Sequence, residues 1–260
     1  MTDLHAVSHI SSRDNAWLKQ LRKLAQDPGA YRRQGQVWLE GDHLCRAAVA
    51  RGRRAQVAVF AESAYAHARP ELLQAAERTV VLPETLFEGI SGLESPARMG
   101  FVMALETAPA LEPAAPTVVL DRLQDAGNVG SILRCASAFG FRQVVALKGT
   151  AALWSPKVLR AGMGAHFGLH LIESATPEQL EALAVPLVTT SSHGGEWLHR
   201  CRLPWPCAWV LGHEGQGVGP ELAARSAVAV RIAQPGGEES LNVAAAAAIC
   251  LHASAAQQLG

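Results

Sequence analysis

The sequence contains no hydrophobic run long enough to cross a membrane. Its longest apolar stretch, Val243–Leu251, is far shorter than the roughly 20 residues that a transmembrane helix requires. The first ten residues are polar and include two histidines, which is not the pattern of a secretory signal peptide. These absences argue against membrane-embedded and exported proteins, and we expect a cytoplasmic protein without a membrane partner.

Cysteine is scarce and scattered, which argues against a disulfide framework. The five residues are odd in number and show no CxxC spacing: Cys45, Cys135, Cys201, Cys207 and Cys250. A reducing compartment explains this usage most simply. Two histidines and two cysteines between His193 and Cys207 are zinc ligands by type, but their spacing matches no common zinc framework. We therefore expect no metal.

The chain also lacks an excess charge of either sign. Its 23 Lys and Arg residues balance 23 Asp and Glu residues, which argues against a protein that coats nucleic acid by bulk charge. A balanced total still permits a local patch. Positive side chains gather in the N-terminal third, at Arg13, Lys19, Arg22, Lys23, Arg32, Arg33, Arg51, Arg53 and Arg54. Such a cluster is either a solvated face, which is the commoner case, or a surface that contacts phosphate groups.

What the sequence does have is an alternation of short strand patterns and helical patterns, which is typical of an α/β fold. In the N-terminal part, for example, a strand is expected at Val57–Phe60 and a helix at Pro70–Glu77. Residues 106–116 read ETAPALEPAAP, a composition that predicts a semi-rigid linker. We therefore expect a small α/β domain over residues 1–105 and a second α/β domain over residues 117–260.

The second domain begins with a buried-strand run, Thr117–Asp121, that leads into a polar turn. Gly127-Asn128 is a turn signal, and an amphipathic helix is expected over Val129–Phe139. This arrangement places Asn128 at the start of the helix and Arg134 almost two turns into it.

Two glycine-rich loops follow much later in the chain. Residues 212–219 read GHEGQGVG and come after a strand at Trp209. Gly236 and Gly237 interrupt the chain before Ser240, which we expect to cap a helix over Leu241–Gln257. Because free backbone N–H groups point out of a helix start, such a segment can bind a polar ligand. The first strand is not followed by GxGxxG, so a classical Rossmann fold is disfavoured.

These segments together resemble the three signature motifs of the SpoU/TrmH family of SPOUT RNA methyltransferases. The likeness rests on Asn128 with Arg134, on Gly212–Gly217 and on Ser240–Val243, in this order. Residues 12–41 also resemble the RNA substrate-binding domain that many members carry at the N-terminus, so the likeness covers nearly the whole chain.

The resemblance implies a transfer of a methyl group from S-adenosylmethionine to a ribose 2′-hydroxyl of RNA. Ribosomal RNA is the expected substrate, and transfer RNA is the alternative. The family also implies a homodimer, and a C-terminal SPOUT domain whose parallel sheet ends in a deep trefoil knot, a rare exception to the rule against knots.

The same resemblance implies the residues of the site. Arg134 is placed at the reacting hydroxyl, with Asn128, Glu214, Ser240 and Asn242 around it. The implied cofactor contacts are Thr190, Gly212, Gly215, Gly217, Ile232 and Leu241. Since a guanidinium stays protonated in proteins, we expect Arg134 to clamp a phosphate or polarise the 2′-oxygen, while Glu214 or an RNA phosphate takes the proton.

Two other functions remain open from the sequence. A non-catalytic RNA-binding assembly factor could keep the same fold, but the presence of all five implied catalytic residues argues against it. The second is a methyltransferase or nucleotide enzyme acting on a small molecule, which would not need the basic N-terminal third. Lys157 and Arg160 are further candidates for phosphate contacts.

Overall fold

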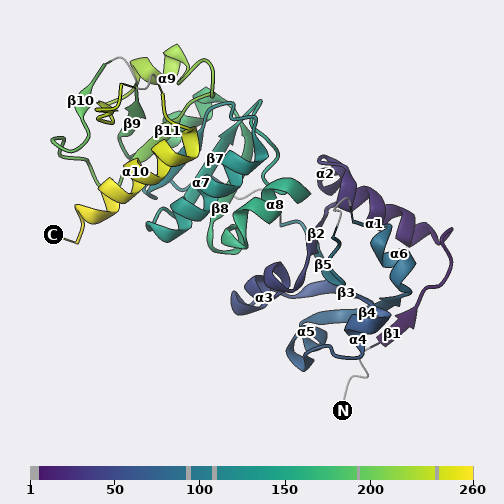
Figure 1. Ribbon diagram of the computed structural model, residues 1–260. Coiled ribbons are helices and arrows are strands. Elements are labelled where there is room, and N and C mark those ends of the chain that lie inside the picture. The colour runs from purple at the N-terminus through teal and green to yellow at the C-terminus, as the bar shows by residue number, and fades with distance from the viewer. Residues whose placement is uncertain (1–5, 92–94, 107–109, 192–193, 238–239, 260) are drawn as a thin grey trace. The chain divides into compact units, whose positions relative to one another are not determined.

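The computed structural model describes residues 6–91, 95–106, 110–191, 194–237 and 240–259 (Figure 1). These residues form two compact units, one within 1–107 and 154–167 and the other within 108–153 and 168–260. Across the described residues, every helix is too short or too polar to traverse a bilayer.

The first unit is built on a five-stranded mixed sheet in the order β1-β4-β3-β5-β2. β1, β3 and β4 are parallel, whereas β5 is antiparallel to both β3 and β2. The strands are β1 (Ala6–His9), β2 (Gln36–Glu40), β3 (Ala55–Ala61), β4 (Ala76–Leu82) and β5 (Met99–Ala104). The helices are α1 (Ala16–Gln26), α2 (Ala30–Gln34), α3 (Asp42–Ala50), α4 (Glu62–Tyr65), α5 (Pro70–Gln74), α6 (Glu84–Glu88) and α8 (Pro156–Gly162).

Helix α1 shows how the sequence pattern gives this unit its basic face. The side chain of Asn15 accepts a hydrogen bond from the Leu18 N–H at 3.1 Å and so caps the helix. Leu18, Leu21 and Leu24 recur at helical spacing and are buried. The lysines and arginines between them therefore lie on the outer side of the helix.

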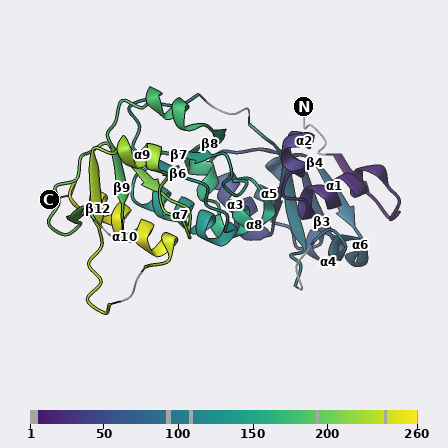
Figure 2. The ribbon, with the colours of Figure 1, turned by 90° about the horizontal axis from the view of Figure 1, so that it is seen from above.

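The second unit is built on a seven-stranded sheet in the order β10-β12-β9-β11-β6-β7-β8, in which every pair of neighbours is parallel (Figure 2). The strands are β6 (Thr117–Leu120), β7 (Gln143–Leu147), β8 (His170–Ala175), β9 (Leu187–Thr190), β10 (Glu196–Trp197), β11 (Ala208–Leu211) and β12 (Val228–Arg231). The helices are α7 (Ala126–Ala138), α9 (Pro220–Ala224) and α10 (Val243–Ala256), with a 3-10 turn η2 (Pro177–Ala182) after β8. A second 3-10 turn, η1 (Ala165–Gly168), comes before β8, and all but its last residue belong to the first unit. The predicted α/β class is confirmed, and the trefoil knot stays a prediction.

The central strands of the second sheet are buried on both faces, as a parallel sheet requires. Trp209 on β11 is fully buried, and its indole N–H donates to the Ser254 hydroxyl of α10 at 2.8 Å. Helix α10 also packs beside α7 (Figure 1). The C-terminal helix is thus fastened both to the middle of the sheet and to the first helix of the unit.

Three predicted helices have different bounds in the structure, and caps explain where two of them begin. Helix α7 begins at Ala126 instead of Val129, because the Asp125 carboxylate caps it by accepting the Asn128 N–H at 2.7 Å. Helix α10 begins at Val243, and its cap is Asn242 instead of Ser240, because the Asn242 side chain accepts the first free N–H groups.

The helix predicted over Pro70–Glu77 ends at Gln74. The helix cannot continue to Glu77 because strand β4, which pairs with both β1 and β3, already starts at Ala76.

The segments around the expected linker have defined partners. Residues 110–116 belong to the second unit, where the backbone of Glu112 exchanges two hydrogen bonds with the side chain of Gln143, at 2.8 and 3.2 Å. Residues 154–167 lie within the stretch assigned by sequence to the second domain, yet they group with the first unit. In that unit, Gly164 approaches Ala47 of α3 so closely that an added Cβ would lie 2.5 Å from the alanine methyl group.

Candidate cofactor and catalytic site

Three of the expected cofactor residues lie at the ends of neighbouring strands. Thr190 is the last residue of β9, Gly212 directly follows β11, and Ile232 directly follows β12. Because β12, β9 and β11 are adjacent and parallel, their carboxyl ends meet at one edge of the sheet. Neighbouring strands are about 4.8 Å apart, so these three residues span roughly 10 Å of that edge.

The loop after β11 folds back on itself and leaves no room for a side chain at its base. A Cβ added to Gly212 would lie 2.2 Å from the carbonyl carbon of Gly217. The Gly217 N–H donates to the His213 carbonyl at 2.8 Å, and the Gly215 N–H points to Nδ1 of His213 at 3.0 Å. The loop therefore offers a compact surface of backbone, which a ligand can approach closely.

Sequence reasoning missed Asp121 and Arg122, which anchor this loop. Asp121 follows β6, is only 3% exposed, and accepts the Gly219 N–H at 2.7 Å. Its carboxylate also accepts Nε of Arg122 at 2.7 Å, and Arg122 reaches the side chain of Gln216 at 3.1 Å. A carboxylate directly after a buried strand is the signal that could have identified this anchor.

A row of three side chains joins the three sequence motifs. The Asn242 Nδ2 donates to Oδ1 of Asn128 at 3.0 Å, and the Asn128 Nδ2 donates to Oε1 of Glu214 at 3.3 Å. We call these three residues the polar row. The structure thus brings together Asn128, Glu214 and Asn242, three of the five expected catalytic residues.

The orientation of the polar row follows from the helix cap. The Asn242 Oδ1 accepts the N–H groups of Ala244 and Ala245 at 2.9 and 3.2 Å, so only its amide nitrogen is left for Asn128. Asn128 must then present its oxygen to Asn242 and its nitrogen to Glu214. Glu214 therefore ends the row as the acceptor of the Asn128 amide.

Several groups hold the Glu214 carboxylate in its charged form. Partial burial by itself raises the pKa of Glu214, but hydrogen bonds outweigh it and bring this pKa below the usual value. The donors are its own backbone N–H, the Asn128 amide and the N–H groups of Asp125 and Gln124. A carboxylate of lowered pKa is a weak base and a stable hydrogen-bond acceptor.

The other two expected catalytic residues lie outside the polar row. Arg134 lies on the exposed side of α7, six residues after Asn128, which is about 9 Å along a helix axis. Ser240 is exposed and comes just before α10. Within the described ranges, neither side chain forms a hydrogen bond or an ion pair.

The same edge of the sheet has the mixed character that S-adenosylmethionine requires. Ile232 is half-buried and Leu241 is 38% exposed, which provides apolar surface. The side-chain oxygen of Gln234 is buried and accepts no hydrogen bond from any described residue. A buried acceptor without a donor, in the segment that follows β12, fits an adenosine that carries N–H and O–H donors.

No comparable site for a metal is found in the part of the chain that the structure describes. There, no group of three or more His, Cys, Asp or Glu side chains could hold an ion. The set of possible zinc ligands that the sequence disfavoured includes His193, which lies outside the described residues. All five cysteines are free thiols, and burial raises the pKa of Cys207 to about 11 and of Cys250 to about 12.

Comparison with known proteins links this arrangement to RNA methylation. The sequence profile of the SpoU rRNA methylase family matches residues 115–252, which include the whole polar row. A tRNA/rRNA methyltransferase of Synechocystis, itself uncharacterized, is 31% identical over 97% of this chain and 95% of its own length.

Two further comparisons extend over most of the molecule. The 23S rRNA (guanosine(2553)-2′-O)-methyltransferase RlmP of Bacillus subtilis is 29% identical over 82% of this chain and 86% of its own length. The crystal structure of an AdoMet-bound rRNA methyltransferase from Sinorhizobium meliloti has the same fold, with a TM-score of 0.85, 24% identity, and coverage of 98% of this chain and 99% of the other.

Proposed function

The chain belongs to the SpoU rRNA methylase family and is an S-adenosylmethionine-dependent RNA 2′-O-methyltransferase, and from this premise we propose that its substrate is ribosomal RNA. The RlmP relative, which acts on 23S rRNA, supports this substrate class and matches more than four-fifths of both chains. Transfer RNA is the alternative substrate. Work on ribosomal RNA would place the protein in the cytoplasm.

The polar row is the observation that carries the proposal for the active site. The bound cofactor supplies a methyl group on a positively charged sulfur, which makes that carbon an activated electrophile. A ribose hydroxyl is a weak nucleophile at neutral pH, so the protein must align its oxygen and accept its proton. In our proposal Glu214 accepts a hydrogen bond from the 2′-hydroxyl and turns an oxygen lone pair towards the methyl group.

A weak base is sufficient for this reaction. When the 2′-oxygen gains the methyl group before it loses its proton, it becomes a protonated ether, which is a strong acid. The proton can then pass to a carboxylate even though the pKa of Glu214 is lowered. Asn128 and Asn242 hold that carboxylate in place through the row.

The proposed role of Arg134 is to bind a phosphate of the RNA next to the reacting ribose. Its guanidinium is permanently charged and can bind two phosphate oxygens at once. Ser240 is proposed to contact the same part of the substrate, since it is exposed just before the cap of α10.

The proposed cofactor contacts are the six residues expected from the sequence, together with Gln234. In this proposal the backbone at Gly212, Gly215 and Gly217 contacts the cofactor, and Thr190, Ile232 and Leu241 surround its adenosine. The buried oxygen of Gln234 would accept a donor of the adenosine, which gives that oxygen the partner it otherwise lacks.

The proposed division of labour assigns RNA recognition to residues 1–105 and catalysis to residues 117–260, with 106–116 between them. The outer side of α1, which carries Lys19, Arg22 and Lys23, supports a phosphate-binding role for the first part.

We also propose a homodimer formed through α10. This helix is alanine-rich and carries few polar side chains, and Ile249 is 41% exposed on it. An apolar residue of that exposure on such a helix favours burial against a second copy.

The proposal is tested by mapping 2′-O-methyl groups in RNA from cells with and without the gene. The expected result is one or a few ribosomal positions that lose the mark without the gene and regain it when purified protein and S-adenosylmethionine are added. Loss confined to transfer RNA would support the alternative substrate. Cofactor binding without transfer to either RNA would instead indicate a non-catalytic assembly factor.

A further inference from the structure

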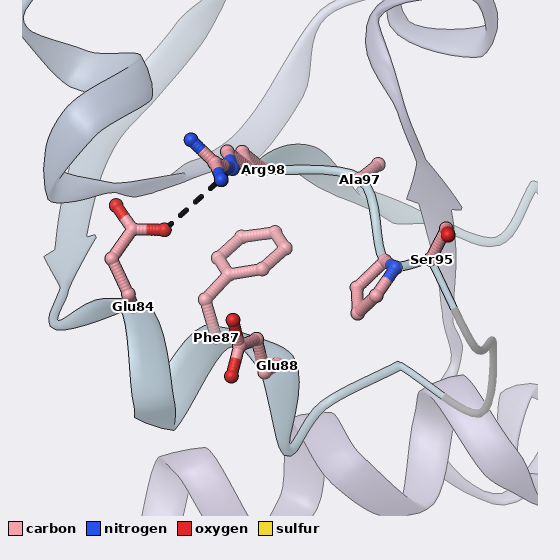
Figure 3. Close-up of a pocket in the computed structure, with 7 residues that line it drawn as sticks. Glu84, Phe87, Glu88, Ser95, Ala97 and Arg98 are labelled. Carbon is pink, nitrogen blue, oxygen red and sulfur yellow. Dashed lines mark ion pairs between the residues drawn. The ribbon is translucent and has the colours of Figure 1, made fainter.

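The first unit contains a small cavity that the proposed activity does not use. It has a volume of about 290 Å³ and lies between helix α6 and the segment that leads into β5 (Figure 3). It is lined by Glu84, Phe87, Glu88, Ser95, Pro96, Ala97 and Arg98. The volume is at the lower end of the range for small-molecule pockets, which begins at about 300 Å³, so it suits one planar ring system.

The walls of the cavity combine an apolar floor with a charged rim. The half-buried Pro96 and Ala97 provide apolar surface, whereas Phe87 is only 2% exposed; its ring stands between the carboxylate of Glu84 and the backbone of Ala97 in Figure 3. On one side of the rim, Glu84 is already engaged, because it accepts the Ser63 N–H at 2.9 Å and pairs with Arg98 at 3.8 Å.

Glu88 is the member of the rim that is available to a ligand. It is exposed at the end of α6, and its side chain forms no hydrogen bond or ion pair with any described residue. Its carboxylate can therefore accept two parallel N–H groups from a planar partner.

The cavity also lies beside the basic helix of the same unit. The Gln26 side chain of α1 donates to the carbonyl of Ile90 at 3.1 Å, just beyond α6. At Gly89, which directly follows Glu88, an added Cβ would lie 3.8 Å from Nε of Arg22. A polyanion that runs along α1 would thus bring its attached groups to the mouth of the cavity.

We propose that this cavity binds a single unstacked guanine base of the RNA substrate. Guanine presents two adjacent donors, N1–H and N2–H, on its Watson–Crick edge, which match the free carboxylate of Glu88. Adenine, cytosine and uracil do not present two adjacent donors there, so they leave the carboxylate incompletely paired. The apolar floor covers the ring, while Arg22 and its neighbours on α1 hold the phosphates. RNA-binding proteins commonly read unpaired bases in bulges and loops in this way.

This inference rests on the proposed RNA substrate and is tested with the full-length protein. Four RNA hairpins are prepared that differ only in one bulged nucleotide, which is G, A, C or U, and their affinities are measured by fluorescence anisotropy at constant salt. The G hairpin should bind about tenfold more tightly than the others, since one good bidentate contact gives discrimination of about this size.

Variants locate the preference within the molecule. Glu88→Gln keeps the size of the side chain but replaces one acceptor with a donor, so the preference for G should fall to about twofold. Glu71→Gln changes an exposed glutamate of α5 that does not line the cavity, and it should keep the full preference.

The inference is overturned if the four hairpins bind equally, if none binds, or if Glu88→Gln keeps the preference. Methyl transfer by the unaltered protein to ribosomal RNA is measured on the same preparation. Transfer without any preference for G refutes only the cavity assignment, whereas an absence of transfer to any RNA refutes the proposed substrate.

Discussion

A single methyl group at Gly212 should open the loop that we assign to the cofactor. In Gly212→Ala the new Cβ would lie 2.2 Å from both the Gly217 carbonyl carbon and the Val218 nitrogen, whereas ordinary contact begins at 3.4 Å. Both neighbours are backbone atoms, and the Gly217 N–H is tied to the His213 carbonyl at 2.8 Å. The loop can therefore accept the methyl group only by moving about 1 Å.

The size of the effect follows from this displacement. Overpacking of a tight site costs about 1–3 kcal/mol of folding free energy. For a protein of about 150–250 residues each kcal/mol lowers the Tm by about 2–4 °C, so the variant should melt about 2–12 °C below the unaltered protein. Because the displaced loop also carries the proposed backbone contacts, the Kd for S-adenosylmethionine should rise at least about tenfold, or about 1.4 kcal/mol.

The same loop supplies a matched control. In Gly215→Ala the nearest atoms to the new Cβ belong to the His213 ring at 3.8 Å, so the free protein should melt as before. Thermal unfolding without cofactor and calorimetric titration with S-adenosylmethionine are measured on both variants. An unchanged Tm for Gly212→Ala, or an equal loss of stability in both variants, would refute the steric reasoning.

Four shorter predictions concern the chemistry and the RNA. Asn128→Asp should lower single-turnover methyl transfer about 100-fold, because it places a second carboxylate against Glu214; a normal rate would contradict the polar row. Arg134→Lys should keep RNA affinity within about twofold and lose most of kcat, and near-normal kcat would remove this arginine from the chemistry. The pKa of Glu214 in the folded protein is lowered from 4.5, so the ionised Glu214 stabilises the folded state above that pH. This contribution to the free energy of unfolding is lost as the pH falls through the lowered pKa. The difference in unfolding free energy between the unaltered protein and Glu214→Gln should therefore be constant from about pH 8 to 5 and shrink below 4.5, and a change near neutral pH would be inconsistent with this. Arg22→Gln should reduce the slope of log affinity against log salt by about one, and an unchanged slope would show that this side chain meets no phosphate.

Much of the fold could be predicted because parallel strands that are buried on both faces read as continuous apolar runs. The buried-strand run expected over Thr117–Asp121 is β6, which starts at Thr117 and ends one residue earlier, at Leu120. Edge strand β1 was missed because all four of its side chains are exposed, so it has no apolar pattern. Helices of four or five residues, such as α4 and α6, complete too few turns to establish a helical period.

The candidate site is harder to derive from local patterns because its parts are distant in sequence. Asn128 lies 86 residues from Glu214 and 114 residues from Asn242, so no periodicity relates them. Their association was implied by family resemblance, and the physical reason appears only in the sheet order, which brings the carboxyl ends of β6 and β11 together. Arg122 has a φ of +61°, a left-handed conformation that an arginine rarely adopts and that could not be predicted from the residue type.

Asn242 caps the last helix and also sets the direction of the polar row. The stability of the row and the stability of the first turn of α10 are therefore coupled. Whatever stabilises the row must, by thermodynamic reciprocity, make the opening of the first turn of α10 less favourable. The backbone amides of Ala244 and Ala245, which donate to Asn242, thereby become natural reporters. Their hydrogen-exchange rates would record ligand binding at the proposed site without any label on the RNA or on the methyl donor.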